Sequence, residues 1–483
     1  MSLRASAVPI PHSEPHSLEQ KPRRVQRRAG ALIVACLLSA TACADETGAS
    51  RPQWKVFIDT DAPVPAFGSL LFVEVTDDVG APLGLNSQRL IDVSRSGVWP
   101  VSFGVLPSFG TAPRVRARLY RTDQAGARGA PEGSALLDAS ARLPELGDRP
   151  LSVTVSLDMN CFGLPAQLAE HLTCAPHSGE LEPEPVLTPE VQTQSESRVN
   201  GWLPAASVPC SSTPPEGMVC IPGGAFVLGS LTPESSSPLH ASLPAHLVQL
   251  SPFFLDAYEV TVGQVRKLIE NGALSETLMQ PNTIDRFCTY AGDAASSNDL
   301  PANCLSWFAA RQICGALSKR LPTEAEWEYS AGNLAQKTRF SWGDDPDICA
   351  HALVARADWM RAQACLLGSH SVPGPAAGNA PVQAGDVTAL GVHNLAGNVA
   401  EWVEDRYESY TGPCWQVEAY GLPAREPLRN PVCETGHDGS VRRAVRGGSF
   451  GSLPASANTV MRDMLQDDTL SDTLGFRCAR SAY

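Results

Sequence analysis

Residues 319–329 have the sequence Lys-Arg-Leu-Pro-Thr-Glu-Ala-Glu-Trp-Glu-Tyr. This stretch is the strongest indication of the fold of the second half of the chain. Thr323 and Glu326 have the spacing of a capping box, in which each side chain accepts the backbone N–H of the other residue. The stretch therefore predicts a helix that begins after Thr323. Upstream, Ser306 is a second N-cap candidate, for a helix that extends to Leu317.

A third helix start precedes both of these. Thr261 and Gln264 form another capping box, and Val260 and Val265 are placed to make the hydrophobic staple that fixes the entry of the chain. Gly272 is positioned to end this helix. Because Gly, Asn and Pro dominate between the three helices, we expect an irregular α+β domain, held by buried Trp residues and disulfides rather than by a large sheet.

Composition limits the function classes. The chain has 483 residues, 37 Lys+Arg against 51 Asp+Glu, a net charge of −14 and 43% hydrophobic residues. This length suits two or three folded domains. An acidic chain without basic clusters in its body is a poor nucleic-acid binder, because phosphates require Lys and Arg. The numbers also exclude a polytopic membrane protein.

Before the helical part, residues 51–174 are predicted to be all-β. The segments 114–120 and 151–157 alternate polar and apolar residues with period two, which is typical of strands. Short strands separated by Gly, Pro and Asp favour an immunoglobulin-like sandwich. Residues 175–215, rich in Pro, Glu, Ser and Thr, are expected to be a flexible, semi-extended linker.

The beginning of the sequence has the features of an export signal. Basic residues at 21–28 precede a short apolar run at 29–38, and Ala-Thr-Ala follows immediately before Cys43. We expect a signal peptide over residues 1–42, lipidation at Cys43 and a short tether over 43–50. The expected location is the cell envelope, through a lipid anchor in a bacterial membrane.

Cysteine parity supports this interpretation. The chain has 14 cysteines, Cys36 leaves with the signal, and lipidation of Cys43 leaves an even number that can all pair. None has a zinc-binding spacing, so structural disulfides are expected. Spacing alone does not determine connectivity. Pairing between sequence neighbours predicts Cys161–Cys174, Cys210–Cys220, Cys288–Cys304, Cys349–Cys365 and Cys414–Cys433.

Seven segments, taken in order, resemble the formylglycine-generating enzyme family, also called sulfatase-modifying factors. The segment 319–329 is the most specific. The others are 217–226, 253–261, 340–343, 391–402, 446–450 and 474–478, so that the resemblance covers about residues 216–481. It implies, over 216–483, a compact α+β domain related to C-type lectins. It also implies the long disulfide Cys314–Cys478.

The resemblance also indicates what this chain lacks. In the family's enzymes two cysteines after the Gly-Gly-Ser-aromatic motif hold Cu(I), which activates oxygen to oxidise a substrate cysteine. Here Ser452 and Ala457 stand at these positions, and Ala400 replaces an aromatic residue. Soft thiolates suit Cu(I), and neither serine nor alanine replaces them. We therefore expect no copper and assign no catalytic residue.

Two further family features bear on the site. The family's calcium ligands correspond to two side chains and two backbone carbonyls, at Asn394, Gly397, Val399 and Glu401. Hard oxygen donors of this kind suit Ca²⁺. A disulfide common in the family is absent as a pair, because Ala331 and Arg462 occupy its two positions.

These observations predict a non-catalytic binding module, carried by an exported, lipid-anchored protein that is monomeric. Its partner would be a peptide, a glycan or another envelope protein. Two alternatives stay open. One is an oxidase that acts on protein cysteines through a different ligand set, and the other is a purely structural component of the envelope.

Overall fold

A computed structural model describes residues 51–482. It excludes the segments 79, 85–86, 108–112, 127–129, 191–195, 233–241, 280–287, 291–296, 356–364, 366–385, 423–424 and 435–440. The expected signal peptide, the tether and Cys43 lie outside the described residues. Among the described helices, none is both long and apolar enough to cross a membrane.

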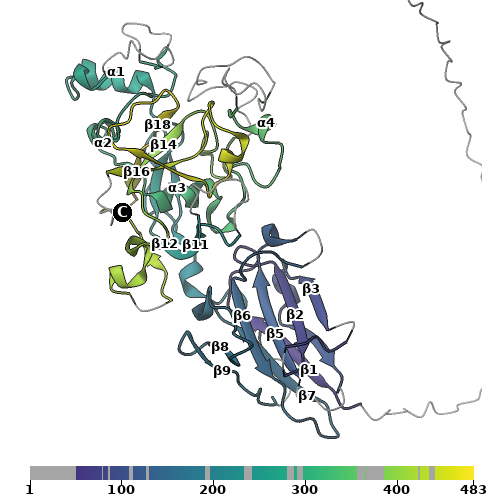
Figure 1. Cartoon of the computed structure of the whole chain (residues 1–483). Coiled ribbons are helices and arrows are strands. Elements are labelled where there is room, and N and C mark those ends of the chain that lie inside the picture. The colour runs from purple at the N-terminus through teal and green to yellow at the C-terminus, as the bar shows by residue number, and fades with distance from the viewer. Residues whose placement is uncertain are drawn as a thin grey trace, which may run out of the picture. The chain divides into compact units, whose positions relative to one another are not determined.

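The first part of the described chain consists of strands (Figure 1). Its two sheets have the strand orders β4-β1-β7 and β3-β2-β5-β6. The strands are β1 (Trp54–Thr60), β2 (Leu70–Thr76), β3 (Gln88–Asp92), β4 (Val101–Val105), β5 (Arg114–Tyr120), β6 (Leu137–Arg142) and β7 (Leu151–Leu157).

The alternation noted in the sequence is confirmed at β5 and β7, which occupy the predicted residues. Apolar side chains from both sheets share one core, which contains Val56 of β1, Leu71 of β2 and Val153 of β7. The all-β prediction for this part therefore holds, whereas its assignment as immunoglobulin-like stays a prediction.

The expected flexible linker is wrong for residues 180–190. Strand β8 (Leu172–Ala175) pairs antiparallel with β9 (Glu180–Pro183). Glu184 follows, and its buried carboxylate is 2.7 Å from the Arg114 guanidinium of β5. The acidic composition suggested a spacer exposed to solvent, but the Glu184 carboxylate forms an ion pair with the buried Arg114 of the sheet.

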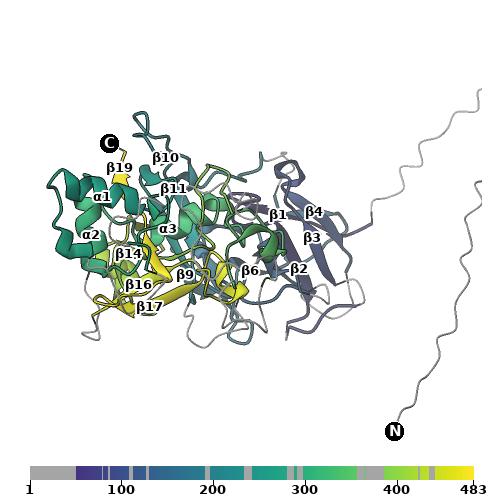
Figure 2. The ribbon, with the colours of Figure 1, turned by 90° about the horizontal axis from the view of Figure 1, so that it is seen from above.

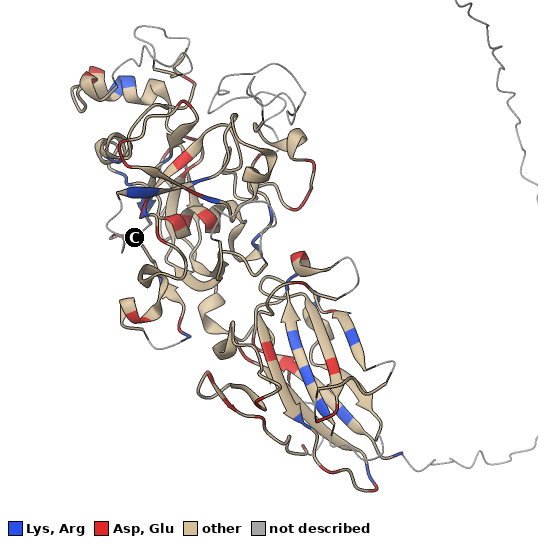
Figure 3. Ribbon diagram, viewed as in Figure 1, with Lys and Arg blue, Asp and Glu red and all other residues tan. Residues whose placement is uncertain are grey.

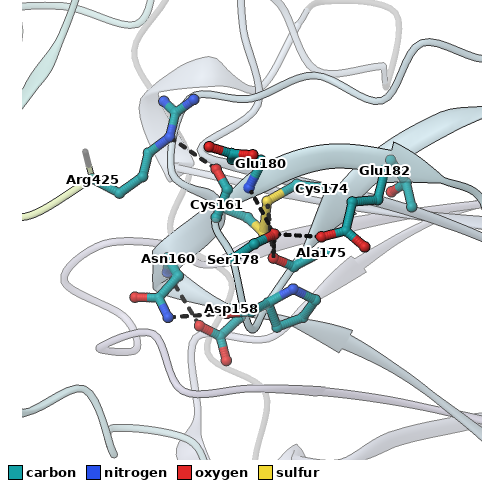
Figure 4. The surroundings of a disulfide bond; sticks show 12 residues. Asp158, Asn160, Cys161, Cys174, Ala175, Ser178, Glu180, Glu182 and Arg425 are labelled. Carbon is teal, nitrogen blue, oxygen red and sulfur yellow. Dashed lines mark hydrogen bonds between the residues drawn. A yellow bond between two sulfur atoms is a disulfide. The ribbon is translucent and has the colours of Figure 1, made fainter. Parts of the chain in front are cut away.

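The β8–β9 hairpin also contacts the second half of the chain. The Cys161–Cys174 disulfide closes the segment that leads into the hairpin, as Figure 4 shows. Arg425 donates from Nε to the backbone oxygen of Gly179, 3.1 Å away. Residues of the expected linker thus contact both the all-β part and the second half of the chain.

The second half forms an α+β domain of small sheets and short helices. Its sheets have the orders β10-β13-β19, β11-β12-β15 and β17-β16-β14-β18. The strands are β10 (Met218–Ile221), β11 (Gly224–Leu228), β12 (His246–Leu250), β13 (Phe253–Asp256), β14 (Ala400–Arg406), β15 (Leu428–Arg429), β16 (Arg442–Arg446), β17 (Arg462–Gln466), β18 (Leu474–Phe476) and β19 (Ala479–Ser481).

The helices are α1 (Val262–Glu270), α2 (Trp307–Ala316), α3 (Glu324–Ala331) and α4 (Ile348–His351). The three predicted helix starts are confirmed. Both halves of the capping box are formed at α1 and α3, and the Ser306 side chain caps α2. Figure 2 shows helices α1 and α2 next to β14. Apolar side chains of both helices share one cluster with β14 and β18. Helix α3 is buried along its length, and its acidic residues are visible in Figure 3.

All six predicted disulfide bonds are present, including the long one from Cys314 on α2 to Cys478. Near it, β19 pairs with β13, which pairs with β10. The Ser211 hydroxyl donates to the backbone oxygen of Ala482 at 2.5 Å. The start and the end of the domain are therefore joined side by side.

Candidate functional site

The predicted calcium residues lie in one tight turn that enters β14. Asn394 and Asn398 both adopt the left-handed conformation, with φ of 60° and 71°, which asparagine tolerates better than most residues. Gly397 lies against Leu353, where an added Cβ would come within 2.8 Å of the Leu353 backbone nitrogen. Val399 is buried. The turn is therefore fixed by backbone geometry and close packing.

Glu401, the last residue of the set, is buried and held by two partners. Arg477, which follows β18, donates from Nε to both carboxylate oxygens at 2.9 and 2.8 Å, and from Nη2 to Oε1 at 2.7 Å. Trp327 of α3 donates from Nε1 to Oε2 at 2.9 Å. Helix α3 and the chain after β18 thus position this carboxylate together.

The asparagine side chains point to a second carboxylate. Asn394 and Asn398 donate from their amides to the two oxygens of Glu259, at 2.9 and 2.8 Å. Glu259 is 1% exposed. Burial raises its pKa to about 8; Arg477 opposes this shift and Glu401 adds to it.

A third buried carboxylate, Asp386, approaches the same turn. It accepts the Ser341 hydroxyl and the backbone N–H of Ala396. Burial raises the pKa of Asp386 to about 6, and Arg477 and Glu401 are among the charges that act on it. Asp386 is therefore electrostatically coupled to the same cluster as Glu259.

In this cluster Glu401 pairs directly with the Arg477 guanidinium, and the charge of Arg477 also acts on the buried carboxyl groups of Glu259 and Asp386. Carboxylate, amide and backbone oxygens are the donors that Ca²⁺ prefers, and the cluster carries more negative than positive charge. The chemical types of the donors thus suit a divalent cation, whereas both oxygens of Glu401 already accept hydrogen bonds from Arg477 and Trp327. Calcium at this turn stays a prediction. Sequence reasoning missed Glu259, because its partners Asn394 and Asn398 lie more than one hundred residues away along the chain. It also missed Asp386, whose partner Ser341 lies in a different loop. The signal for Glu259 was its place in the segment 253–261.

Among the described residues, the environment of the two positions that correspond to the family's copper-binding cysteines, Ser452 and Ala457, contains no cluster of buried carboxylates like the one at the turn before β14. The Ser452 hydroxyl lies 2.8 Å from the Ser449 hydroxyl and accepts the Ser449 backbone N–H. Ala457, in the 3-10 turn Pro454–Ala457, is 1% exposed. It packs in an apolar cluster with Phe340, Val354 and Ala396. Neither position offers a thiolate, and the second is filled by hydrocarbon.

At one of the two positions of the missing family disulfide, a buried ion pair is present. Arg462 is fully buried and makes a bidentate pair with Glu324 of α3, with contacts of 2.6 and 2.8 Å. Its guanidinium also lies 3.7 Å from the centre of the Tyr410 ring. Ala331, the other position, is buried at the end of α3.

In the part of the chain that the structure describes, one group of three potential metal ligands was found, Glu408, Cys414 and Cys433. The two sulfurs form a disulfide, so they are not thiolate ligands in this state. The group therefore does not replace the missing copper ligands.

Comparisons with known proteins agree with the resemblance. Residues 205–482 match the family described as "Sulfatase-modifying factor enzyme 1-like domain". The formylglycine-generating enzyme of Bos taurus is 27% identical, and the match covers 55% of this chain and 75% of that protein. A protein from Chlamydia pneumoniae named "Serine/threonine-protein kinase pkn1" is 28% identical over 55% of this chain. The match spans only 38% of that longer protein.

Among solved structures, PvdO from Pseudomonas aeruginosa is similar to this chain with 22% identity and a TM-score of 0.38. The match covers 58% of this chain and 98% of PvdO.

Proposed function

The chain belongs to the sulfatase-modifying factor enzyme 1-like family, and from this premise we propose that its C-terminal domain is a non-catalytic binding module. The observation that carries the proposal is the packing of Ala457 inside an apolar cluster, together with the Ser449–Ser452 hydrogen bond. Oxidation of a substrate cysteine by O₂ needs a metal that exchanges electrons, and Cu(I) needs soft ligands. The residues at both positions support a role without this chemistry.

The test is a direct assay for the family's reaction. Purified full-length protein is incubated with copper, O₂ and a cysteine-bearing peptide, and aldehyde is measured beside copper content. We expect neither stoichiometric copper nor aldehyde. Turnover that scales with added copper would refute the binding role and favour the alternative oxidase.

We propose in addition that the turn before β14 holds calcium, through the side chains of Asn394 and Glu401 and the carbonyls of Gly397 and Val399. Bound Ca²⁺ would neutralise part of the negative charge of the cluster. Asp386 would supply negative charge from a neighbouring element, and Arg477 would keep Glu401 oriented. The role assigned to the ion is to fix the turn, with no step in a reaction.

Export and lipid anchoring at Cys43 belong to the same proposal, which places the module at a bacterial envelope facing a peptide, a glycan or a surface protein. Support comes from the signal-like sequence before Cys43 and from the six disulfides, which suit an oxidising compartment. Mass spectrometry of the native N-terminus checks it: acylated Cys43 is expected, and a free thiol there would contradict it.

A further inference from the structure

The all-β part is covered along one side and open along the other. At the covered side, Arg142 of β6 forms a β-bridge with Val186, and Ser152 of β7 forms one with Glu190. At the other side, within the described residues, β3 pairs only with β2 and β4 pairs only with β1. Figure 2 shows β3 and β4 on the same side of this part. Each sheet therefore ends there in an unpaired edge strand.

A groove of about 200 Å³ lies between these two edge strands, next to the core that the two sheets share. Apolar side chains from β2, from β3, and from β4 and the residue after it line the groove: Val73, Val75, Ile91, Phe103, Val105 and Leu106. Ile91 and Phe103 pack against the core and yet are only half-buried, and Leu106 is 63% exposed. An apolar ligand in this groove would withdraw that surface from water, which is favourable.

One charged side chain, Arg89 of β3, joins the apolar lining. In the β2–β3 register Arg89 lies directly opposite Val73, which is 3% exposed and belongs to the core. Because directly opposite residues project from the same face of a sheet, Arg89 lies on the face of β3 that is turned to the interior. Its side chain is exposed, and among the described residues it has no ion-pair partner. The groove thus presents one accessible positive charge beside an apolar wall.

These features together select a ligand class. The volume lies below the usual range for drug-sized ligands, roughly 300–1,000 Å³, so the groove suits one narrow aliphatic chain. An inward-pointing charge on an edge strand discourages the addition of another strand, which disfavours an extended peptide. Arg89 is the single charged side chain of the described lining, so it matches a ligand with one negative charge. A carboxylate carries one charge, whereas a phosphate monoester carries about 1.5 to 2 at pH 7.

We propose that this groove binds the carboxylate form of a medium-chain fatty acid. The aliphatic chain lies between Ile91 of β3 and Phe103 of β4, and the Arg89 guanidinium pairs with the carboxylate. The site belongs to the all-β part, and it is therefore separate from the binding role proposed for the C-terminal domain.

The test is a calorimetric titration with octanoate, hexanoate and octylammonium, each below the concentration at which it forms micelles. The full chain carries Cys43→Ser, so that neither an acyl group nor a detergent competes for the groove. Octanoate binds saturably, with one site per chain. Hexanoate binds about 15-fold more weakly, because two fewer CH₂ groups are buried and each contributes about fourfold. Octylammonium, whose charge Arg89 repels, binds about tenfold more weakly than octanoate.

Two variants of the lining test the assignment of the groove. Arg89→Gln removes the charge of an exposed side chain, so the protein folds normally and its affinity for octanoate falls about tenfold. Leu106→Asp places a carboxylate at the exposed rim of the groove and weakens octanoate binding at least as much. The matched control is Arg95→Gln, because Arg95 is exposed in the turn after β3 and does not line the groove. It retains wild-type affinity.

The proposal is overturned if octanoate shows no saturable binding, or if hexanoate or octylammonium binds as tightly as octanoate. It is also overturned if either lining variant binds octanoate like the wild type. An equal loss in Arg95→Gln and Arg89→Gln would contradict it as well, because the loss would then reflect net charge alone. None of these results affects the aldehyde assay, so the two proposals fail separately.

Discussion

The turn before β14 and the turn around Ser452 differ in what holds them. At the first, Glu401 is fixed by Arg477 and Trp327, and removing Arg477 leaves the Glu401 carboxylate as an unpaired charge in a low-dielectric interior. At the second, Ser452 and Ala457 are small side chains that fit without charged partners. A group built into a charge network is costly to replace, whereas a thiol that only binds copper is replaced at little cost to the fold.

The largest expected effect tests the charge network. Arg477→Met leaves Glu401, Glu259 and Asp386 without their buried guanidinium, and we expect the free energy of unfolding to fall by about 3–5 kcal/mol. Urea denaturation measures it. The control is Arg480→Met, because Arg480 is exposed on β19, and it should change stability by less than about 0.5 kcal/mol. A loss below about 1 kcal/mol for Arg477→Met would mean that the turn does not depend on this charge.

The second prediction concerns calcium at the same turn. At a Ca²⁺ concentration one hundred times Kd, binding should stabilise the protein by about 2.7 kcal/mol, and chelation should remove this gain. Thermal unfolding with Ca²⁺, Mg²⁺ or EDTA measures the effect. Asn394→Ala should abolish the calcium response, whereas Asn160→Ala, on the surface of the all-β part, should leave it intact. An equal response in both variants would place the ion elsewhere.

The third prediction restores thiols at the other turn. Ser452→Cys combined with Ala457→Cys should bind copper and still give no aldehyde, because Ala400 also differs from the family pattern. Extra volume at Ala457 overfills its apolar cluster, so stability should fall by about 1–3 kcal/mol. Native mass spectrometry counts the copper. Ser452→Cys with Ala455→Cys, at an exposed neighbouring position, is the matched dithiol. Equal copper binding by the two dithiols would show that the Ala457 position is not special.

The smallest expected effect is the pH dependence of stability at Asp61, which lies outside both turns. Asp61, after β1, has a pKa raised to about 6, first by burial and then by Asp158. Since the folded pKa lies above the unfolded value, the folded state binds more protons between these values. Stability therefore falls as pH rises through about 6.

Because Asp61 is partly exposed, we discount the effect to about 1 kcal/mol. Asp61→Asn keeps the acceptor for the Met159 N–H, so it should stabilise the protein at pH 7.5 and have no effect at pH 4. Chemical denaturation at both pH values checks this, with Asp78→Asn as the exposed control. An equal gain at both pH values would exclude ionisation as the cause.

The sequence predicted local structure well, because capping and alternation depend on neighbours. Thr323 and Glu326 needed only each other to define the start of α3. Glu184 shows the limit, since its charge looked solvated until the fold placed Arg114 beside it. The same holds for Glu259, whose amide partners are Asn394 and Asn398. Residue type indicated the predicted calcium donors, but only the fold shows which distant carboxyl groups lie near them.

The pairing of β10, β13 and β19, with Ser211 bonded to Ala482, bears on how such a domain can be carried by other chains. A polypeptide that enters near residue 211 leaves near residue 482, where the Ser211 hydroxyl donates to the backbone oxygen of Ala482. Splicing the domain into a surface loop of a host protein would therefore separate the two host ends very little. The domain could therefore be inserted into another chain as a unit, and the Cys314–Cys478 disulfide cross-links it internally.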